Sequence, residues 1–236
     1  MRQRILFGPI RSRRLGISLG VDIIPHKTCT FNCVYCECGE TTNLTLKRRE
    51  YVSLKEVTGK LEYYLKKNPH LDHITFSGSG EPTLHSRIHE IIAYIRDNFP
   101  RYRVAVLTNG SMLNQKEVRK ALKEAQVVIP SLNAVSREIF GKINRPHPGI
   151  TSHQVISGLV KFRQEYRGKM ILEIFIVPGL NDEQRELELL KEAIERIRPD
   201  QVQLGTLYRW GTEDWVEEAE PANMERIAAY LEAQVT

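Results

Sequence analysis

Apolar and polar positions alternate along this chain with two different periods. Short runs rich in β-branched residues predict buried strands, because strands covered on both faces of a parallel sheet read as nearly continuous apolar segments. Between them, apolar residues spaced three and four apart predict helices. Strands are expected at Val21–Pro25, His73–Ser77, Arg103–Thr108, Val127–Leu132, Ile171–Val177 and Gln201–Leu207. Helices are expected at Ser53–Lys67, Ser86–Asn98, Asn114–Glu124, Ser152–Tyr166, Asp182–Arg196 and Ala222–Ala233.

This alternation within 236 residues predicts one α/β domain with a parallel sheet. The sheet is either doubly wound or curled into part of a barrel, and periodicity does not choose between the two. In both architectures a functional site lies at the carboxyl ends of the strands. Polar and turn-forming residues follow several predicted strands, at Gly78–Pro82, Asn109, Asn133 and Pro178. The site is therefore expected at this end of the sheet.

The hydropathy of the chain argues against a membrane protein and against a secreted one. No run of about eighteen apolar residues is present, so neither a spanning helix nor a membrane partner is expected. Gly8 and Pro9 interrupt the N-terminal apolar stretch before it reaches the length of a signal-peptide core. A cytoplasmic location is expected.

Charge is distributed unevenly, although the net charge is only +5. Residues 1–20 form a basic leader, with Arg2, Arg4, Arg11, Arg13 and Arg14 and no acidic residue, ahead of a core domain at residues 21–236. Residues 213–225 carry six acidic residues and no basic one. A basic leader can attract an anionic substrate or RNA. Solvated surface charge of both signs is the plainer interpretation.

All four cysteines, Cys29, Cys33, Cys36 and Cys38, lie within ten residues after the first predicted strand. Such crowding closes no long loop, so it indicates metal or redox chemistry in a reducing compartment rather than a disulfide framework. The first three have the spacing C-x3-C-x2-C, which lets one loop place three thiolates around an iron–sulfur centre. Three thiolates would leave one iron open to a small molecule.

Two other interpretations of the cysteines stay open at this level. Zinc sites with four thiolates usually use two C-x2-C pairs on separate loops, and this spacing differs from that pattern. A zinc site of three thiolates and one histidine, such as His26, has no supporting motif. A redox pair formed by Cys33 and Cys36 leaves Cys29 without a role.

With Tyr35 as the aromatic residue before its last cysteine, this segment resembles the signature of the radical S-adenosylmethionine (SAM) superfamily. Four segments after predicted strands are similar to further motifs of that superfamily, namely Ser79–Pro82, Leu107–Gly110, Pro130–Asn133 and Phe175–Gly179. Ser79 stands where glycine is common, and Asn133 replaces the commoner Asp. The leader, at Phe7–Asp22, resembles stand-alone radical SAM iron–sulfur oxidoreductases related to wybutosine-synthesis enzymes that act on tRNA.

The resemblance implies a partial (β/α)6 TIM-like barrel with parallel strands in a single domain. It implies that a [4Fe-4S] cluster is held by Cys29, Cys33 and Cys36. It further implies SAM contacts from Tyr35, Ser79, Gly80, Glu81, Asn109, Ser131, Asn133 and Val177. Residues that handle the substrate are not identified by it.

The activity implied is reductive cleavage of SAM to a 5′-deoxyadenosyl radical that abstracts hydrogen from a substrate, RNA-borne or small and anionic. An external one-electron donor of flavodoxin or ferredoxin type is expected as a partner. Arg145 and Arg209 follow predicted strands and are candidates to hold an anion, and Trp210 and Trp215 to stack on a base. An activase acting on a protein partner and a non-enzymatic zinc or RNA-binding module are the alternatives.

Overall fold

The computed structural model describes residues 4–236, so Arg2 of the basic leader lies outside the described part. The main sheet contains, in spatial order, β1 (Leu6–Ser12), β2 (Gly16–Val21), β5 (His73–Phe76), β6 (Arg103–Thr108), β7 (Val127–Pro130), β8 (Lys169–Phe175), β9 (Gln201–Gly205) and β10 (Gln234–Val235). The strands from β2 to β10 pair in parallel, and β1 pairs with β2 in antiparallel. A second, two-stranded sheet joins β3 (Thr28–Cys29) to β4 (Asn43–Leu44).

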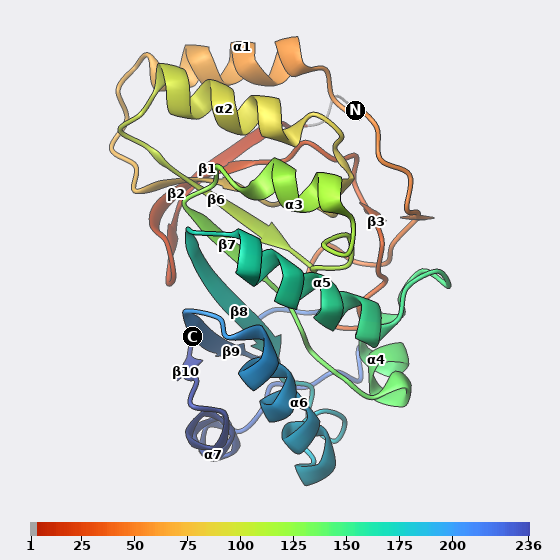
Figure 1. Cartoon of the computed structure of the whole chain (residues 1–236). Helices are drawn as coiled ribbons and strands as arrows, with labels where there is room; N and C mark the ends of the chain where they lie inside the picture. The colour runs from red at the N-terminus through yellow and green to blue at the C-terminus, as the bar shows by residue number, and fades with distance from the viewer. Residues whose placement is uncertain (1–3) are drawn as a thin grey trace.

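The connecting helices lie together on one face of this sheet (Figure 1). They are α1 (Leu54–Leu65), α2 (Ile88–Asn98), α3 (Lys116–Leu122), α4 (Arg137–Asn144), α5 (Ser152–Glu165), α6 (Gln184–Ile197) and α7 (Pro221–Leu231), with a 3-10 turn, η1 (Pro82–Leu84). Strands β2 to β9 follow chain order without the reversal of a doubly wound sheet. The fold is therefore the expected partial barrel of parallel strands.

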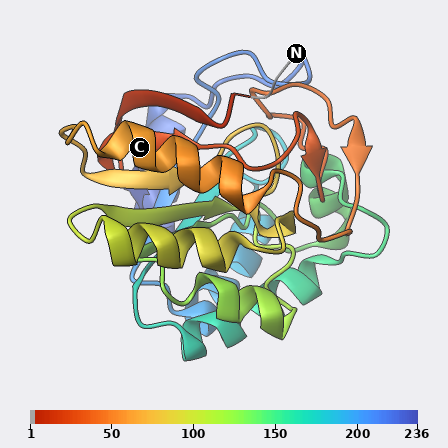
Figure 2. The same cartoon turned by 90° about the horizontal axis from the view of Figure 1, so that it is seen from above.

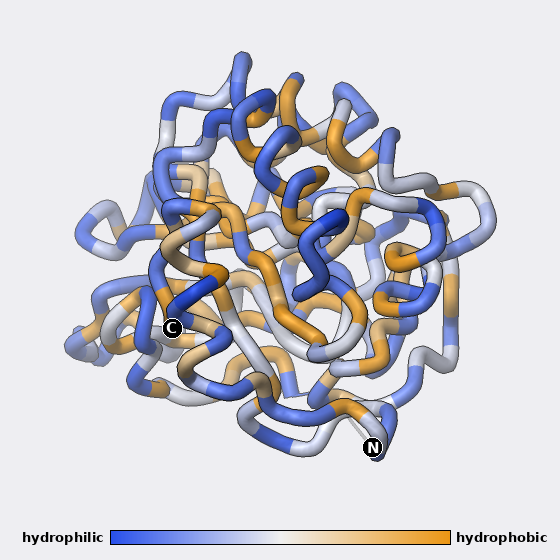
Figure 3. The backbone as a smooth tube through the Cα atoms, turned by 90° about the horizontal axis from the view of Figure 1, so that it is seen from below, coloured by the Kyte–Doolittle hydropathy of each residue, from blue (hydrophilic) through white to orange (hydrophobic). Residues whose placement is uncertain are grey.

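Two apolar layers result from this arrangement. The outward sides of the strands pack against the helices in the main core, which includes Ile74, Val106 and Leu172. The inner face of the sheet, which is the face turned away from these helices, has its own apolar cluster of Leu15, Ala105, Val127, Ile129 and Ile171. Figure 3 shows the apolar stretches concentrated inside the molecule and the hydrophilic ones around them. Within residues 4–236, no helix is long and apolar enough to cross a bilayer.

Most elements form where the hydropathy pattern predicts them, and local capping explains their starts. The expected cap of α1 is confirmed, because the Ser53 side chain accepts a hydrogen bond from the amide of Glu56. Thr151 and Gln154 form a reciprocal capping box at the start of α5. The expected cap at Asn114 is wrong, since α3 begins later, at Lys116, after Gln115.

The expected first strand is displaced toward the N-terminus. The structure has β2 at Gly16–Val21, and the amide of Asp22 then bonds to the carbonyl of Ile5 as the chain leaves the sheet. Ile23 and Ile24 are buried without being in a strand, which is why their apolar character gave a misleading boundary. Residues 6–21, which include most of the basic leader, thus form a β-hairpin whose inner strand belongs to the parallel sheet.

Two helical glycines provide a test of this packing. A Cβ at Gly158 in α5 would lie 2.5 Å from the amide nitrogen of Asn114, whereas a Cβ at Gly59 in α1 would meet nothing within 4 Å. Gly158→Ala should therefore lower the free energy of unfolding by about 2 kcal/mol through overpacking. Gly59→Ala should raise it by about 0.5–1 kcal/mol, because alanine favours the helix. Urea unfolding followed by far-UV circular dichroism measures both, and equal midpoints for the two variants would contradict the close approach of α5 to residues 113–114.

Candidate functional site

The cysteine loop, residues 29–38, lies at the carboxyl end of the sheet and is held from two sides. The amides of Asn32 and Val34 donate to carbonyls of Asn144 and Ile143 at the end of α4. On the other side, the Thr212 hydroxyl donates to the Cys36 carbonyl at 3.2 Å. The segment before α7 therefore packs on the loop although it lies far away in sequence, as Figure 2 also shows.

Three cysteines have a nitrogen donor beside their sulfur, and each donor comes from a different part of the chain. Asn109 Nδ2 lies 3.6 Å from Cys29 Sγ, and Asn144 Nδ2 lies 3.4 Å from Cys33 Sγ. Lys27 Nζ lies 3.1 Å from Cys36 Sγ. Such donors stabilise anionic sulfur and tune the potential of an iron–sulfur cluster.

Cys38 differs from the other three cysteines. Its sulfur donates to the carbonyl of Gly78 at 3.7 Å, so it faces a hydrogen-bond acceptor. Within residues 4–236, no three histidine, cysteine or acidic side chains are arranged to hold a single metal ion. The chemistry of the donor set fits a cluster gripped by Cys29, Cys33 and Cys36, since each ligand of a cubane binds a separate iron.

Burial changes the acidity of these thiols. Desolvation raises the pKa of Cys29 to about 12, with the nearby Glu81 carboxylate adding to the rise. Desolvation also raises the pKa of Cys33 to about 11. The hydrogen bond from Cys38 and the positive charge of Lys27 lower the pKa of Cys36. Metal binding needs thiolates, so a centre held here would displace the protons of Cys29 and Cys33.

The Gly78–Pro82 loop packs directly against the start of the cysteine loop. The amide of Lys27 donates to the Ser79 carbonyl at 2.8 Å. A Cβ at Gly80 would lie only 2.3 Å from the carbonyl oxygen of Thr28, so no larger residue fits there. Ser79, which stands where the superfamily often has glycine, turns its hydroxyl to Asp22 Oδ2 at 2.7 Å.

Glu81 is occupied within the chain. Its Oε1 accepts hydrogen bonds from the amide and hydroxyl of Thr83 and from the hydroxyl of Thr108, and its Oε2 accepts the amide of Asn109 at 2.8 Å. The residue is 2% exposed, and burial raises the pKa of its carboxyl group although these bonds oppose the rise. This carboxylate joins η1 to the end of β6, and its contacts are with the protein itself.

Tyr35, which is partly buried, contacts a second group of predicted site residues. Its ring stacks on Phe175 with centroids 4.0 Å apart, and its hydroxyl accepts a hydrogen bond from Asn133 Nδ2 at 2.6 Å. Asn133 Oδ1 accepts the amide of Phe175, so both ends of this amide are paired. The amide of Val177 is bonded to Asn181 Oδ1 at 2.7 Å. These contacts fix the ring of Tyr35, a residue of the cysteine loop, against Phe175 and Asn133.

Ser131 lies deeper on the inner face, where its hydroxyl donates to Glu173 Oε2 at 3.2 Å. Arg145 forms an ion pair with Glu213, which connects the acidic segment at residues 213–225 to the end of α4. His26 takes part in none of the contacts described above. Two residues near the sulfurs were not expected from the sequence, Lys27 and Asn144, because no motif marks them and only the fold brings them there.

Asp22 positions the Gly78–Pro82 loop, a role that the sequence analysis did not predict. Its carboxylate accepts the amide and hydroxyl of Ser79, at 3.0 and 2.7 Å, and the amide of Ile24. Asp22→Asn should lower the free energy of unfolding by about 1–2 kcal/mol, because an amide nitrogen then faces donors. Urea denaturation measures the change. The matched variant Asp97→Asn, on the exposed end of α2, should change it by less than about 0.5 kcal/mol; equal effects would show that Asp22 does not hold the loop.

Comparison with known proteins supplies the family. The Radical SAM superfamily matches residues 23–191, a segment that includes the cysteine loop and the Gly78–Pro82 loop. The chain belongs to the radical SAM superfamily. Its members use a [4Fe-4S] cluster and SAM, so the chain is a radical SAM enzyme whose class of chemistry is the radical cleavage of SAM.

Two relatives are similar to this chain over nearly its whole length. A UPF0026 protein of Methanocaldococcus jannaschii is 32% identical over 230 residues, which cover 96% of this chain and 70% of the relative. A protein of Brachyspira hyodysenteriae named GTPase Obg is 37% identical over 233 residues, and the chain spans only 34% of its length.

Two solved structures share the fold. The structure of TYW1 with a lysine–pyruvate adduct bound has a TM-score of 0.67 at 16% identity, covering 91% of this chain and 72% of that one. A radical SAM methyltransferase from Sphaerobacter thermophilus has a TM-score of 0.70 at 16% identity, covering 93% and 65%. At this identity the likeness concerns the fold alone.

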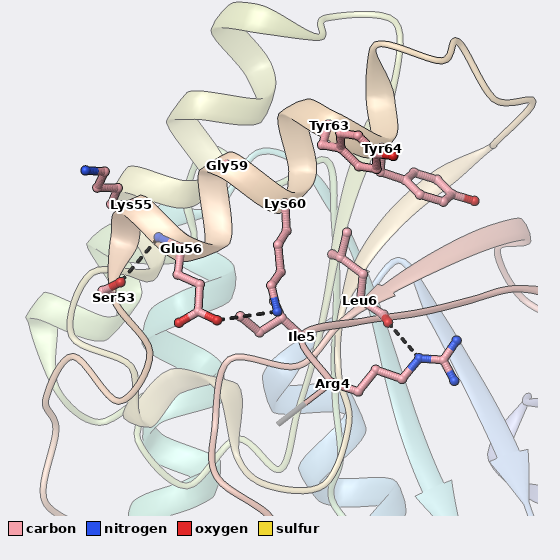
Figure 4. Close-up of a pocket in the computed structure, with 10 residues that line it drawn as sticks. All are labelled: Arg4, Ile5, Leu6, Ser53, Lys55, Glu56, Gly59, Lys60, Tyr63 and Tyr64. Carbon is pink, nitrogen blue, oxygen red and sulfur yellow. Dashed lines mark hydrogen bonds and ion pairs between the residues drawn. The ribbon is translucent and has the colours of Figure 1, made fainter. Parts of the chain in front are cut away.

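A separate groove lies away from this site. It has a volume of about 610 Å³ and runs between residues 4–6 and helix α1 (Figure 4). Tyr63 and Tyr64 stand above one end, and Lys60 extends across the groove toward Glu56. None of the predicted site residues lines it.

Proposed function

We propose that Cys29, Cys33 and Cys36 hold the [4Fe-4S] cluster and that SAM occupies the remaining iron. The observation that supports this most is the difference among the four sulfurs. Nitrogen donors accompany the three motif cysteines, whereas Cys38 faces a carbonyl. When bound, the cluster supplies the electron that cleaves SAM, and the 5′-deoxyadenosyl radical so released removes a hydrogen atom from the substrate.

The chain's own residues set the conditions for this chemistry. Lys27, Asn109 and Asn144 direct N–H groups at the three sulfurs and thereby stabilise negative charge on them. Asp22 fixes the Ser79 amide and hydroxyl, and Gly80 lets the backbone approach residue 28 closely. We assign SAM contacts to the Gly78–Pro82 loop and to Asn109, Ser131, Asn133 and Val177.

Exclusion of water is a second contribution of the protein. Val34, Ile143, Val177 and Val216 form an apolar cluster beside the cysteine loop, each less than 5% exposed. Tyr35 packs on this cluster and is stacked on Phe175. We infer that this wall protects a radical from solvent, and that the substrate arrives from the inner face of the sheet. The electron comes from a separate one-electron donor of flavodoxin or ferredoxin type.

Anaerobic reconstitution tests the proposal. The purified chain is loaded with iron and sulfide, and 5′-deoxyadenosine is measured by chromatography after addition of SAM and dithionite. We expect about four irons and four sulfides per chain and formation of 5′-deoxyadenosine. Bound zinc without sulfide, or a fully loaded cluster that yields no 5′-deoxyadenosine, would overturn it.

A further inference from the structure

A cavity of about 480 Å³ lies between the leader hairpin and the segment after β9. Its lining comes from residues 10–15 at the β1–β2 turn, from Glu37, from Leu107 and Ile129 on the inner face, and from Tyr208 and Arg209. Glu37 directly follows the proposed cluster ligand Cys36. The cavity therefore extends from the cysteine loop to the molecular surface.

Positive charge dominates this cavity. Four arginines line it, Arg11, Arg13, Arg14 and Arg209, against a single carboxylate, Glu37. Arg14 is neutralised by Glu173 on the inner face. Arg209 and Glu37 are 3.9 Å apart and both largely exposed, so their attraction is weak. Arg11 and Arg13 have no ion pair within residues 4–236, which leaves two guanidinium groups able to bind an anion in bidentate fashion.

Exposed aromatic rings accompany these arginines. Tyr208 is 71% exposed, and the guanidinium carbon of Arg13 lies 5.1 Å from its ring centroid. Trp210, two residues farther along, is 82% exposed. Sites for single-stranded nucleic acid combine positively charged side chains, which bind phosphates, with aromatic rings, on which bases stack. Both kinds of side chain occur together here.

The inner end of the cavity is chemically different from its mouth. Leu107 and Ile129 form an apolar floor there. Leu107 lies two residues before Asn109, whose side chain contacts Cys29 Sγ. A ligand in this cavity would thus meet guanidinium groups and an exposed aromatic ring at the mouth, and apolar side chains at the inner end nearer the cysteine site.

We propose that this cavity binds the substrate, and that the substrate is a nucleotide whose phosphate is held by Arg11 and Arg13 and whose base stacks on Tyr208. The phosphate-bearing nucleotide is either free or part of a single-stranded RNA. The identification of the nucleotide as the substrate rests on the proposed function. Binding of the nucleotide can be measured without turnover.

Equilibrium binding on the reconstituted chain tests it without SAM cleavage. A 5′-fluorescein-labelled ten-nucleotide RNA of mixed sequence is titrated by fluorescence anisotropy, with a mixture of nucleoside 5′-monophosphates as competitor. The double variant Arg11→Gln/Arg13→Gln should bind at least about tenfold more weakly. Its slope of log K against log salt should be smaller by about 0.7, as expected when one phosphate of a single strand is no longer neutralised. Tyr208→Ala should weaken binding about tenfold.

Matched controls separate the cavity from general surface effects. Arg96→Gln/Arg101→Gln removes the same charge from exposed residues. Tyr63→Ala removes an equally exposed tyrosine, 71%, that also lies under a cation, Lys67. Both controls should bind within about twofold of the parent chain, since neither residue set lines the cavity.

The outcomes are distinct. Strong competition by monophosphates identifies a free nucleotide, and tight RNA binding with weak competition identifies an RNA-borne one. Unchanged binding in the cavity variants, or displacement of RNA by polyglutamate as readily as by nucleotides, would overturn the assignment. Loss of 5′-deoxyadenosine formation with intact, cavity-dependent binding would instead contradict the proposed function alone.

Discussion

A chain carrying Cys33→Ala is expected to form no 5′-deoxyadenosine above the level of an enzyme-free control. Cys33 is half-buried in the loop that α4 holds, and Asn144 Nδ2 lies 3.4 Å from its sulfur. Removing one of the three proposed ligands would leave one iron without a thiolate, so we expect the cluster to assemble poorly or to be lost. Iron and sulfide content, the visible absorption of the cluster, and 5′-deoxyadenosine yield measure the effect after identical anaerobic reconstitution.

Cys38→Ala is the matched control within the same loop. Because Cys38 lies outside the three-cysteine motif and its sulfur donates to the Gly78 carbonyl, we expect iron content and product yield within about twofold of the parent chain. The ligand assignment would be refuted if Cys38→Ala lost the cluster while Cys33→Ala kept it. Far-UV circular dichroism of both variants shows whether either change unfolds the chain.

The sequence predicted the fold well where the signal is local. Strand–helix alternation located five of six expected strands and all six expected helices, because buried parallel strands and amphipathic helices have distinct apolar periods. It missed the leader hairpin, β1 and β2, since Phe7 to Ile10 show no clear alternation. It also missed α4, whose eight residues are too few for a periodic signal.

The candidate site was predictable in its motifs and not in its contacts. The cysteine loop, the Gly78–Pro82 loop and Asn109 are marked by spacing, and the fold brings them together. Lys27 reaches Cys36 from a residue in the left-handed backbone region, with φ of 54°. No sequence pattern predicts this conformation for a lysine. Asn144 reaches Cys33 across 111 positions of sequence. Such contacts depend on tertiary packing, which single-sequence patterns do not encode.

Placement of the basic leader changes its interpretation. The sequence allowed its arginines to be solvated surface charge, and Arg4 does donate to the nearby Leu6 carbonyl at an exposed position. The hairpin, however, brings Arg11, Arg13 and Arg14 to the rim of the cavity that leads to the cysteine loop. The sequence alone gives these arginines no specific location. The pairing of β2 with the parallel sheet places them together at one cavity.

Glu81→Ala is expected to lower the free energy of unfolding by about 3 kcal/mol or more. The change leaves the amide of Asn109, the hydroxyl of Thr108 and the amide and hydroxyl of Thr83 without their acceptor in a site that is 2% exposed. Each buried unsatisfied donor costs about 1–3 kcal/mol, with partial relief where a hydroxyl turns to another acceptor. Urea unfolding at neutral pH, analysed by linear extrapolation, measures the loss.

Glu81→Gln distinguishes the shape of this side chain from its acceptor capacity. Glutamine keeps one oxygen but places an NH2 group against donors, so we expect an intermediate loss of about 1–2 kcal/mol. Glu138 is an exposed glutamate on α4 that pairs with Lys142, so Glu138→Ala should shift the value by less than about 0.5 kcal/mol. If Glu81→Ala were as stable as Glu138→Ala, the carboxylate would not join η1 to β6. Because the same bonds place Asn109 beside Cys29, Glu81→Ala should also reduce cluster loading, which links the stability of this corner of the fold to the chemistry it supports.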